Sequence, residues 1–424
     1  MLMTMFPVNS VGRGAVDDSL PGSETLMTER IPAPVVAVIE SADSTLASLQ
    51  AVQASWWPGK QLTVRCKVTA EGGLLAGEHQ IVATAGRVPD GAARVKGPNG
   101  AVGVWVVPND PELPGLSSAL DRHTVSRLFN DIGVGSSIRS VLFRAYRPGR
   151  RGVIEAVGSP QSLFLKVVRP EEAKSLHQKH RHLSARMPVP NSLGYSRDLG
   201  VVVLSAIPGV DLRRILRDRE ANLPTPTAVA ALIENLPYPF DHRVTTSPID
   251  KLPRIAELLS RLVPAEAARL SQLVAAIGPD EREADVPVHG DFYEAQVLVQ
   301  NAQPVGLIDV DTYGLGRPGD DPAMMMGHLT LLASSASNPT RVLAYASRLQ
   351  EIWEAKLDPV DLRRRTAAVI LGQATGPFRV QRPEWPSEVV ARIDLAQRWV
   401  ERSLWADKKS LILASDRSHD RPRS

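Results

Sequence analysis

The chain has 424 residues, of which 43% are hydrophobic and 22% charged, and its formal net charge is +3. This balance is that of an ordinary globular protein, and the length leaves room for two or three domains. The small net charge gives no case for a nucleic-acid partner, the histidines match no common zinc spacing, and no long apolar run predicts a membrane span. The single cysteine, Cys66, cannot form an internal disulfide, which favours a reducing, cytoplasmic setting.

The two ends of the chain lack a sustained pattern. Residues 1–45 mix Gly, Pro, Ser and Asp, so we expect them to be mostly disordered, with one short strand near residues 35–39. Residues 44–53 are compatible with a first helix. At the other end, residues 408–424 are charged and Ser-rich, which predicts a disordered tail.

A small β-rich cap is predicted over residues 46–125. Apolar and polar side chains alternate over residues 61–70, which is typical of a half-buried antiparallel strand. Residues 79–85 and 101–107 have a similar character, and Gly-rich turns lie between them. We expect this cap to be a structural extension without chemistry of its own.

Three further strands are expected in residues 126–204. Residues 138–146 and 153–157 predict an antiparallel pair joined by a tight loop, and residues 162–168 predict the third strand. A helix then begins at Pro170, because proline suits the first helical position.

Two features of these strands suggest anion binding. The loop between the first two contains Gly149, Arg150 and Arg151, and guanidinium groups match phosphate geometry in a bidentate manner. The loop is equally compatible with a solvated basic turn. Lys166 is the one charged residue of the third strand, and a buried ammonium group needs an anionic partner to offset its lost hydration.

Helices dominate the next segment, residues 205–407. Apolar residues recur there at spacings of three and four, which predicts helices over residues 212–218, 227–234, 251–262, 265–277, 323–333, 339–357, 362–373 and 386–405. The loop before the last helix contains Arg379, Gln381 and Trp385, which could hydrogen-bond to a sugar ring and stack on it. The simpler interpretation is that this loop only connects two helices.

A different pattern occupies residues 288–323. Two short apolar runs, residues 297–299 and 305–308, flank a polar turn and predict a β-hairpin. Asp291 precedes the first run and Asp309 closes the second, so strand pairing would bring two carboxylates into one cleft. Spacing alone is equally compatible with a surface hairpin that carries incidental acids.

The order of residues around this hairpin is more specific than its spacing. His-Gly-Asp begins at His289, and Gln296, Asp309, Asp311 and Asp321 follow at defined intervals. This order resembles the active-site signature of the aminoglycoside phosphotransferase and choline kinase-like family, with Gln where the family usually has Asn, as in the maltokinase-like branch. The resemblance implies an α+β, protein kinase-like fold with a small antiparallel β N-lobe and a mainly helical C-lobe, here preceded by the β-rich cap.

The resemblance further implies an ATP- and Mg²⁺-dependent enzyme that moves the γ-phosphate to a hydroxyl of a small molecule. Phosphoryl transfer needs positioned phosphates, a metal ion and a carboxylate that orients the acceptor hydroxyl. The implied roles are a catalytic base for Asp291, support of its loop for His289, Mg²⁺ ligands for Gln296, Asp309 and Asp311, and a structural brace for Asp321.

The kinase fold also implies where the nucleotide binds. The loop between the first two strands covers the phosphates, the third-strand lysine binds them and pairs with a helix acid, and the strand leading into the C-lobe holds adenine. The corresponding residues are Gly149, Arg150 and Arg151, then Lys166, then Glu172, and finally Ser205, Ala206 and Ile207. Glu172 is the candidate by position, because the middle of the helix lacks a carboxylate; it is equally compatible with a simple N-terminal helix acid.

The acceptor stays open between a sugar and an aminoglycoside-like antibiotic. Basic residues match or exceed acidic ones between residues 323 and 405, which slightly favours a maltokinase-like sugar kinase over an enzyme for polycationic antibiotics. The competing hypothesis is a nucleotide-binding pseudokinase with a regulatory or scaffold role, suggested by Gln296 and the missing mid-helix acid. We expect ATP and a small hydroxylated acceptor as partners, without nucleic acid or membrane, and make no prediction of oligomeric state.

Overall fold

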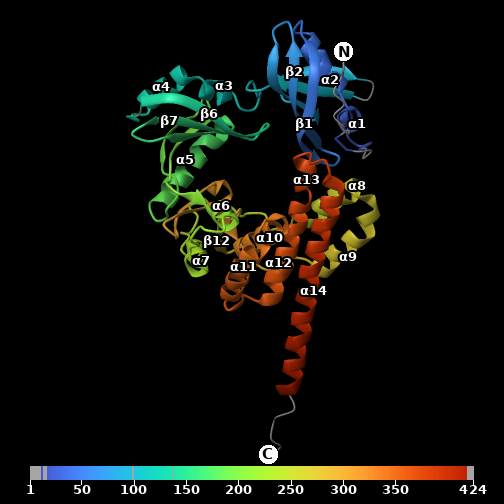
Figure 1. The fold of residues 1–424 in the computed structure, drawn as a ribbon, viewed down its shortest axis with the longest axis vertical. Helices are drawn as coiled ribbons and strands as arrows, with labels where there is room; N and C mark the ends of the chain where they lie inside the picture. The colour runs from blue at the N-terminus through green and yellow to red at the C-terminus, as the bar shows by residue number, and fades with distance from the viewer. Residues whose placement is uncertain (1–10, 13–16, 98–99, 136, 418–424) are drawn as a thin grey trace, which may run out of the picture.

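The computed structural model describes residues 11–12, 17–97, 100–135 and 137–417, with side chains up to residue 403. Two antiparallel five-stranded sheets lie side by side above a mainly helical body (Figure 1). The first sheet belongs to the cap, the second to the N-lobe, and the helical body is the C-lobe. The predicted α+β, two-lobed kinase-like architecture with a preceding β-rich cap is confirmed.

The cap consists of two short helices and a sheet with strand order β1-β2-β3-β5-β4. Its elements are α1 (Ser23–Thr28), α2 (Ala33–Glu40), β1 (Thr45–Trp57), β2 (Gln61–Glu71), β3 (Gly77–Gly86), β4 (Ala93–Gly97) and β5 (Gly100–Val106). In β2 the even-numbered residues from Leu62 to Ala70 are buried, as the alternating sequence requires for a strand with one face on a core.

Three segments of the cap differ from the sequence prediction, and the first is residues 23–28, which form helix α1 where a mostly disordered start was expected. Residues 33–40 form helix α2 instead of a disordered stretch with a strand, because Val35 and Ile39 lie four positions apart and bury one helical face. Residues 45–57 form strand β1 instead of a helix, because they pair along β2 from Thr45 opposite Glu71 to Trp57 opposite Gln61. Tertiary pairing here overrides local propensity. Of the predicted disordered start, residues 1–10 and 13–16 lie outside the described residues.

Helices α3 (Gly115–Leu120) and α4 (Arg122–Asp131) lead into the N-lobe, whose sheet has the strand order β6-β7-β8-β10-β9. Its elements are β6 (Ser137–Arg147), β7 (Arg151–Ser159), β8 (Leu163–Val167), α5 (Pro170–Ser184), β9 (Ser192–Ser196) and β10 (Val201–Ser205). The three predicted strands and the helix at Pro170 therefore form where the sequence indicates them.

The C-lobe contains the helices and a group of short strands at its upper edge. The helical elements are α6 (Leu212–Arg217), α7 (Pro226–Glu234), α8 (Leu252–Leu262), η1 (Pro264–Glu266), α9 (Ala267–Ile277), η2 (Val310–Thr312), α10 (Asp320–Ser335), α11 (Pro339–Glu354), α12 (Pro359–Ala374), α13 (Gly376–Arg379) and α14 (Trp385–Arg417). The strands are β11 (Val210–Asp211), β12 (Val286–Val288), β13 (Val297–Gln300), β14 (Gln303–Leu307) and β15 (Gly314–Gly316). Helix α14 continues through residues 408–417, where the sequence predicted a disordered tail; residues 418–424 lie outside the described part.

The cap shares buried apolar contacts with both lobes. One core cluster runs from β2 into the C-lobe, and the ring of Trp56 lies 6.4 Å from that of Phe378. A second cluster joins Val82 and Trp105 of the cap to Ile154 and other residues of the N-lobe sheet. The cap is therefore built into the molecule on two sides.

The linker after the cap also holds the turn between β6 and β7. The buried carboxylate of Asp110 accepts hydrogen bonds from the Tyr146 hydroxyl at 2.7 Å and from the Gly149 main-chain N–H at 2.7 Å. It further accepts the main-chain N–H of Glu112 at 2.9 Å, and the Trp105 indole donates to Tyr146 at 3.1 Å. These four groups fix the basic turn to the cap.

We expect Asp110→Asn to lower the free energy of unfolding by about 1–3 kcal/mol, because an amide cannot accept all three hydrogen bonds and leaves a buried donor unpaired. Urea unfolding followed by circular dichroism measures this change. Asp198→Asn is the matched control, since Asp198 is exposed, and it should stay within about 0.5 kcal/mol of the parent. Equal stabilities for the two variants would contradict this role of Asp110.

Candidate active site

The loop after β12 is held in one conformation by its own main chain. Gly290 has φ of 77°, and a Cβ atom there would lie 2.8 Å from the carbonyl oxygen of Thr312, so only glycine fits. The carboxylate of Asp321 accepts the main-chain N–H groups of His289 at 2.6 Å and Gly290 at 2.9 Å. The Thr312 hydroxyl donates to the His289 carbonyl oxygen at 2.9 Å. This bracing fixes the direction in which Asp291 leaves the loop.

The His289 ring lies fully buried beneath this loop. Burial lowers the pKa of His289 to about 4, so the ring is neutral at physiological pH. Its Nε2 lies 3.0 Å from the carbonyl oxygen of Ile308, and its Nδ1 accepts the main-chain N–H of Asp291 at 3.3 Å. In this arrangement the ring connects the loop to the end of β14, and both nitrogens are engaged.

Strands β13 and β14 form the hairpin that carries Asp309. Its turn has two residues, Asn301 and Ala302, both at positive φ, and is shorter than the predicted five-residue turn. Asp309 itself has φ of 60° and ψ of 49°, a conformation that non-glycine residues adopt rarely. Such strain persists only where surrounding contacts impose it.

Those contacts come from two cations of the N-lobe sheet. Arg151 reaches both oxygens of Asp309, with N–O distances of 2.8 and 2.9 Å, and one oxygen of Asp311 at 3.0 Å. Lys166 donates to Asp309 at 2.8 Å and also to Asp311. Burial alone would raise the pKa of Asp309, but the charges of Lys166 and Arg151 outweigh it and hold that pKa well below its ordinary range. Two positive and two negative charges thus join the lobes.

The same place offers oxygen ligands of the kind that Mg²⁺ prefers. The buried amide of Gln296 lies 3.5 Å from Asp309, next to the carboxylates of Asp309 and Asp311. Within the described residues, no group of three or more His, Cys, Asp or Glu side chains could hold a metal ion. Two carboxylates and one amide still fit Mg²⁺, because this ion keeps several waters and uses substrate phosphates as further ligands.

Lys166 takes its partners from the C-lobe and not from helix α5. The predicted partner, Glu172, lies in the first helical turn, is half exposed, and has its nearest cation in Arg169 at 3.7 Å. The prediction that Glu172 pairs with Lys166 is therefore wrong. At the middle of α5 the buried Lys179 instead donates to the carbonyl oxygen of Asp311 at 2.6 Å.

The carboxylate of Asp291 lies beside this charge cluster. Burial and the negative charge of Asp309 raise the pKa of Asp291, while Arg147, Arg151 and Lys251 oppose the shift. A carboxylate whose pKa is raised, on a braced loop, suits the acceptance of a proton from a hydroxyl group.

The basic turn between β6 and β7 points its side chains to opposite sides. Arg151 faces the acids of the C-lobe, whereas Arg150 lines a cleft on the cap side and is exposed. The main-chain N–H of Gly149 is already bonded to Asp110. The predictions that Gly149 offers its N–H to phosphate and that Arg150 joins Arg151 there therefore do not match this structure.

The residues after β10 differ in whether their main-chain groups are already hydrogen-bonded. The main-chain N–H of Ser205 donates to the carbonyl oxygen of Asn191 at 2.9 Å, and its hydroxyl accepts the Asn191 N–H at 2.9 Å. In the described part of the chain, no hydrogen bond is found for the main-chain groups of Ala206 or Ile207. Of the three predicted adenine contacts, the structure leaves Ala206 and Ile207 available and engages Ser205.

Two of the three predicted acceptor residues have structural roles. Trp385 is buried and its ring packs edge-on against Phe378 at 5.3 Å, so it cannot stack on a ligand. The Gln381 amide donates to the carbonyl oxygen of Phe378 at 2.7 Å, which closes the turn after α13. Arg379 is exposed and lines the cap-side cleft with Arg150. The prediction of a stacking tryptophan is wrong because the loop folds its aromatic group inward.

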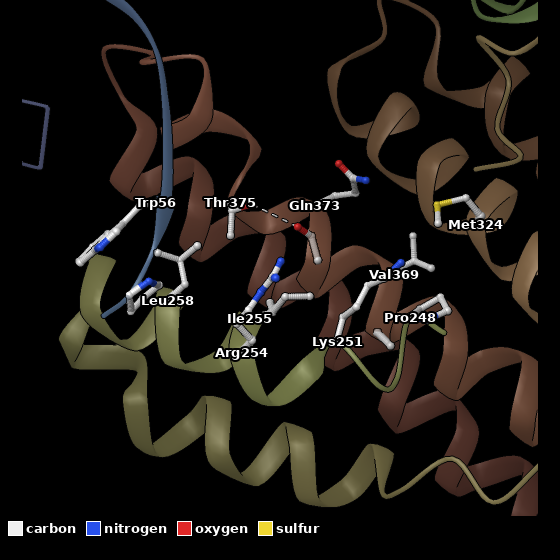
Figure 2. A pocket seen from close by; sticks show the side chains of 13 residues that line it. Trp56, Pro248, Lys251, Arg254, Ile255, Leu258, Met324, Val369, Gln373 and Thr375 are labelled. Atoms are coloured by element: carbon white, nitrogen blue, oxygen red, sulfur yellow. Dashed lines mark hydrogen bonds between the residues drawn. The ribbon is translucent and has the colours of Figure 1, made fainter. Parts of the chain in front are cut away.

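A cavity of about 220 Å³ lies between the cap and the C-lobe helices (Figure 2). Trp56 of the cap lines it together with Lys251 at the start of α8, Arg254 of α8, Met324 of α10 and Gln373 of α12. Burial lowers the pKa of Lys251, and the charges of Asp320 and Asp291 oppose that shift, so Lys251 lies close enough to sense Asp291.

A family model supports the interpretation of this geometry. The model of the phosphotransferase enzyme family (APH) matches residues 153–357, from β7 to just after α11. The match is to this family and covers slightly under half of the chain. The match spans Lys166, the His289 loop, Asp309 and Asp311, but it begins two residues after Arg151, and the cap also lies outside it.

Solved phosphotransferase structures are also similar to this chain, at low identity. An aminoglycoside phosphotransferase APH(4)-Ia in a ternary complex with ADP and hygromycin B is 16% identical, with a TM-score of 0.47, 65% of this chain covered and 97% of the other. A putative aminoglycoside phosphotransferase from Ralstonia eutropha is 13% identical, with a TM-score of 0.46 and coverages of 68% and 98%. The macrolide 2'-phosphotransferase MphH from Brachybacterium faecium is 15% identical, with a TM-score of 0.41 and coverages of 63% and 98%.

No curated protein matches the chain. Because all three TM-scores lie below 0.5, the family assignment stands on the match over residues 153–357. No helix in the described part of this phosphotransferase is long and apolar enough to cross a membrane.

Several charged groups around the phosphotransferase site were missed at the sequence level. Arg147 and Lys251 act on Asp291, but nothing in their local sequence marks them, because folding alone brings them there. The sequence does hint at Lys179, because this residue lies one position from the apolar stripe of α5. The structure shows that it is buried. Asp110 lies in an irregular linker, and its hydrogen bonds to the turn depend on the position of the cap.

The burial of Lys179 predicts a pH dependence of stability. Burial lowers the pKa of Lys179 to about 8, whereas in the unfolded chain a lysine titrates near about 10.4. Between these values the unfolded state binds more protons, so the stability contributed by this group rises with pH. We expect the unfolding free energy of the parent relative to Lys179→Met to increase by about 1–2 kcal/mol between pH 7.5 and about 9.5.

Urea unfolding of both proteins at the two pH values checks this prediction. Lys174→Met is the control on the same helix, because Lys174 is exposed, and its difference from the parent should not change with pH. A pH-independent difference for Lys179→Met would mean that Lys179 keeps its ordinary pKa.

Proposed function

We propose that this phosphotransferase moves the γ-phosphate of ATP to a hydroxyl group of a small molecule, with Mg²⁺. The observation that carries the proposal is the position of Asp291, a partly buried carboxylate with a raised pKa on a braced loop beside the Arg151–Lys166–Asp309–Asp311 cluster. One lobe supplies the cations for phosphate and the other supplies the acids, as phosphoryl transfer requires.

The nucleotide would lie between the lobes. Ala206 and Ile207 have main-chain groups free to hold the adenine edge, while Lys166 and Arg151 reach the phosphates. In the structure these two cations neutralise Asp309 and Asp311, so nucleotide binding exchanges carboxylate partners for phosphate oxygens. The exchange keeps each cation paired throughout.

Asp309, Asp311 and Gln296 would hold Mg²⁺, which when bound neutralises phosphate charge during transfer. In the structure the Gln296 amide nitrogen donates to Asp309 at 3.5 Å, so the amide would have to turn its oxygen towards Mg²⁺ to serve as a ligand. His289 and Asp321 keep the loop in register with Asp309 through their hydrogen bonds to Ile308 and to the loop N–H groups.

The acceptor hydroxyl would hydrogen-bond to Asp291. As its oxygen forms a bond to the γ-phosphorus, the bond from that phosphorus to the bridging oxygen of ADP breaks, and the hydroxyl proton passes to Asp291. The products are a phosphate monoester and ADP. Because Arg147, Lys251 and Arg379 surround this position, a polycationic acceptor of the aminoglycoside type fits poorly, and we propose a sugar-like acceptor in the cytoplasm.

The alternative proposal is a nucleotide-binding pseudokinase. Two observations favour it: Arg151 and Lys166 occupy the oxygens of Asp309, and Lys179 takes the place of a helix acid. A pseudokinase would bind ATP without Asp291-dependent turnover. Nucleotide binding measured beside ADP release therefore separates the two proposals.

We expect Asp291→Asn to lower kcat for ADP release by about 10²–10⁴-fold, because the variant loses the group that accepts the hydroxyl proton. A coupled assay over a panel of sugars, sugar phosphates and antibiotics measures this rate. Asp285→Asn is the matched control, since Asp285 is exposed and four residues before His289, and its rate should equal that of the parent. Turnover that survives Asp291→Asn would refute the base role, and its complete absence from the panel would favour the pseudokinase.

The raised pKa of Asp291 also predicts the acidic limb of the pH–rate profile. A carboxyl with a raised pKa keeps its proton to a higher pH, so kcat/KM should begin to fall at a pH above the ordinary aspartate range as the solution is acidified. Initial rates between about pH 3.5 and about 8 test this. Activity that stays constant down to the ordinary aspartate range would show that Asp291 is not the titrating base.

A further inference from the structure

A second cleft, of about 300 Å³, lies between the cap sheet and the turn that joins β6 to β7. One wall comes from β1 and β2 of the cap and the other from the turn, with α13 at the edge. The lining includes Gln53, Ser55, Trp57, Thr63, Arg147 and Arg150. The cleft lies on the side of the kinase body where the charge of Arg147 is close enough to Asp291 to affect its pKa.

The charge of this cleft is strongly one-sided. Five arginines line it, Arg65, Arg147, Arg150, Arg169 and Arg379, against a single carboxylate. That carboxylate, Glu112, is already bound by Arg87 at 2.8 Å and by Arg169 at 3.3 Å. Its one negative charge therefore leaves most of the guanidinium groups without compensation.

Three of the arginines have no anionic partner. Among the described residues, no carboxylate lies within 4.0 Å of the side-chain nitrogens of Arg147, Arg150 or Arg379. Partial desolvation in the cleft lowers the pKa of Arg150, although its side chain is exposed at the surface, and the charges of Arg147 and Arg169 lower it further by repulsion. A cleft with low-dielectric walls and like charges concentrates the opposite charge, so an anion would relieve this repulsion.

Two further arginines are held in position for such an anion. Arg169 donates to the Gly149 carbonyl oxygen at 2.9 Å, and Arg65 donates to the Gln80 side chain at 3.1 Å while lying over the Tyr146 ring. Preorganised guanidinium groups lose little side-chain entropy on binding and match phosphate or carboxylate oxygens in pairs. The cleft thus combines fixed and free cations.

The cleft also reaches towards the reacting group. Burial raises the pKa of Asp291 and the charge of Arg147 opposes that rise, while desolvation and Arg147 lower the pKa of Arg379 and the charge of Asp291 opposes that fall. Both arginines line the cleft and both lie within electrostatic range of the proposed base. A ligand with an anion in the cleft could therefore place a hydroxyl group at Asp291.

We propose that this cleft binds the anionic group of the acceptor, so that the substrate is a small hydroxylated molecule that also carries a phosphate, sulfate or carboxylate. This inference rests on the proposed function and narrows its acceptor class. It excludes both neutral sugars and polycationic antibiotics as preferred acceptors. The transferred phosphate still comes from ATP, and the proton of the acceptor hydroxyl still passes to Asp291.

Calorimetric titration of the full chain, with ADP and Mg²⁺ present, tests the binding. The probes are glucose 1-phosphate, glucose 6-phosphate and glucuronate, with glucose as the neutral parent. We expect at least one anionic probe to bind more than about tenfold more tightly than glucose. The Arg150→Gln/Arg379→Gln double variant should weaken that probe by about 10–100-fold and leave glucose unaffected.

Arg139→Gln is the matched control, because Arg139 is an exposed residue of β6 without a carboxylate partner in the described chain. It removes the same charge outside the cleft and should not change the affinity. An unchanged thermal midpoint shows that the double variant is folded, as expected for two exposed side chains without partners. Equal binding of anionic and neutral probes, or equal effects of both variants, would overturn the inference.

ADP release with the same probes separates an acceptor from a bound regulator. Release that depends on the anionic probe, on Asp291 and on the two arginines supports the acceptor assignment. Binding in the cleft without transfer overturns it. Turnover of a neutral acceptor at a rate that does not depend on Arg150 and Arg379 also overturns it, but leaves the proposed function intact. If no acceptor gives Asp291-dependent turnover, the proposed function itself is refuted.

Discussion

Two cations from the N-lobe and two carboxylates from the C-lobe meet at one point, and the arrangement of both lobes depends on that meeting. Arg151 and Lys166 come from neighbouring antiparallel strands, whereas Asp309 and Asp311 follow a hairpin more than 140 positions later. Removing one member would leave an uncompensated, partly buried charge, which is strongly destabilising. The left-handed conformation of Asp309 is compatible with folding because these ion pairs impose it.

The same charges hold the acids of the site in place. Each acid has a cation, and Lys179 adds a hydrogen bond to the main chain at Asp311. A helix lysine therefore replaces a helix acid, and Asp311 provides the negative charge that Lys166 needs. Compared with the usual kinase pattern, the carboxylate that pairs with Lys166 comes from the C-lobe, and helix α5 contributes a lysine in place of an acid.

Patterns that depend on local physics could be predicted from the sequence. Alternation in β2, the hairpin before Asp309 and the His289 loop all follow from spacing, turn residues and motif order. Features that depend on tertiary contacts could not. Strand β1 needs β2 as a partner, and the inward position of Trp385 depends on Phe378.

The site shows the same division. The motif residues come together as its order suggests, but motif order does not determine which way a side chain points on a turn. Arg150 and Arg151 are adjacent in sequence, but their side chains point to opposite sides of the turn between β6 and β7. Glu172 was chosen by position on a helix, and an exposed first-turn acid is too far from a strand lysine.

The position of the cap has a consequence for how the molecule moves. Since one buried cluster joins the cap to the C-lobe and another joins it to the N-lobe, the cap bridges the two lobes. Rotation of one lobe against the other would have to break the apolar contacts between the cap and one of the lobes. The first quarter of the chain therefore limits how far the two lobes can move relative to each other.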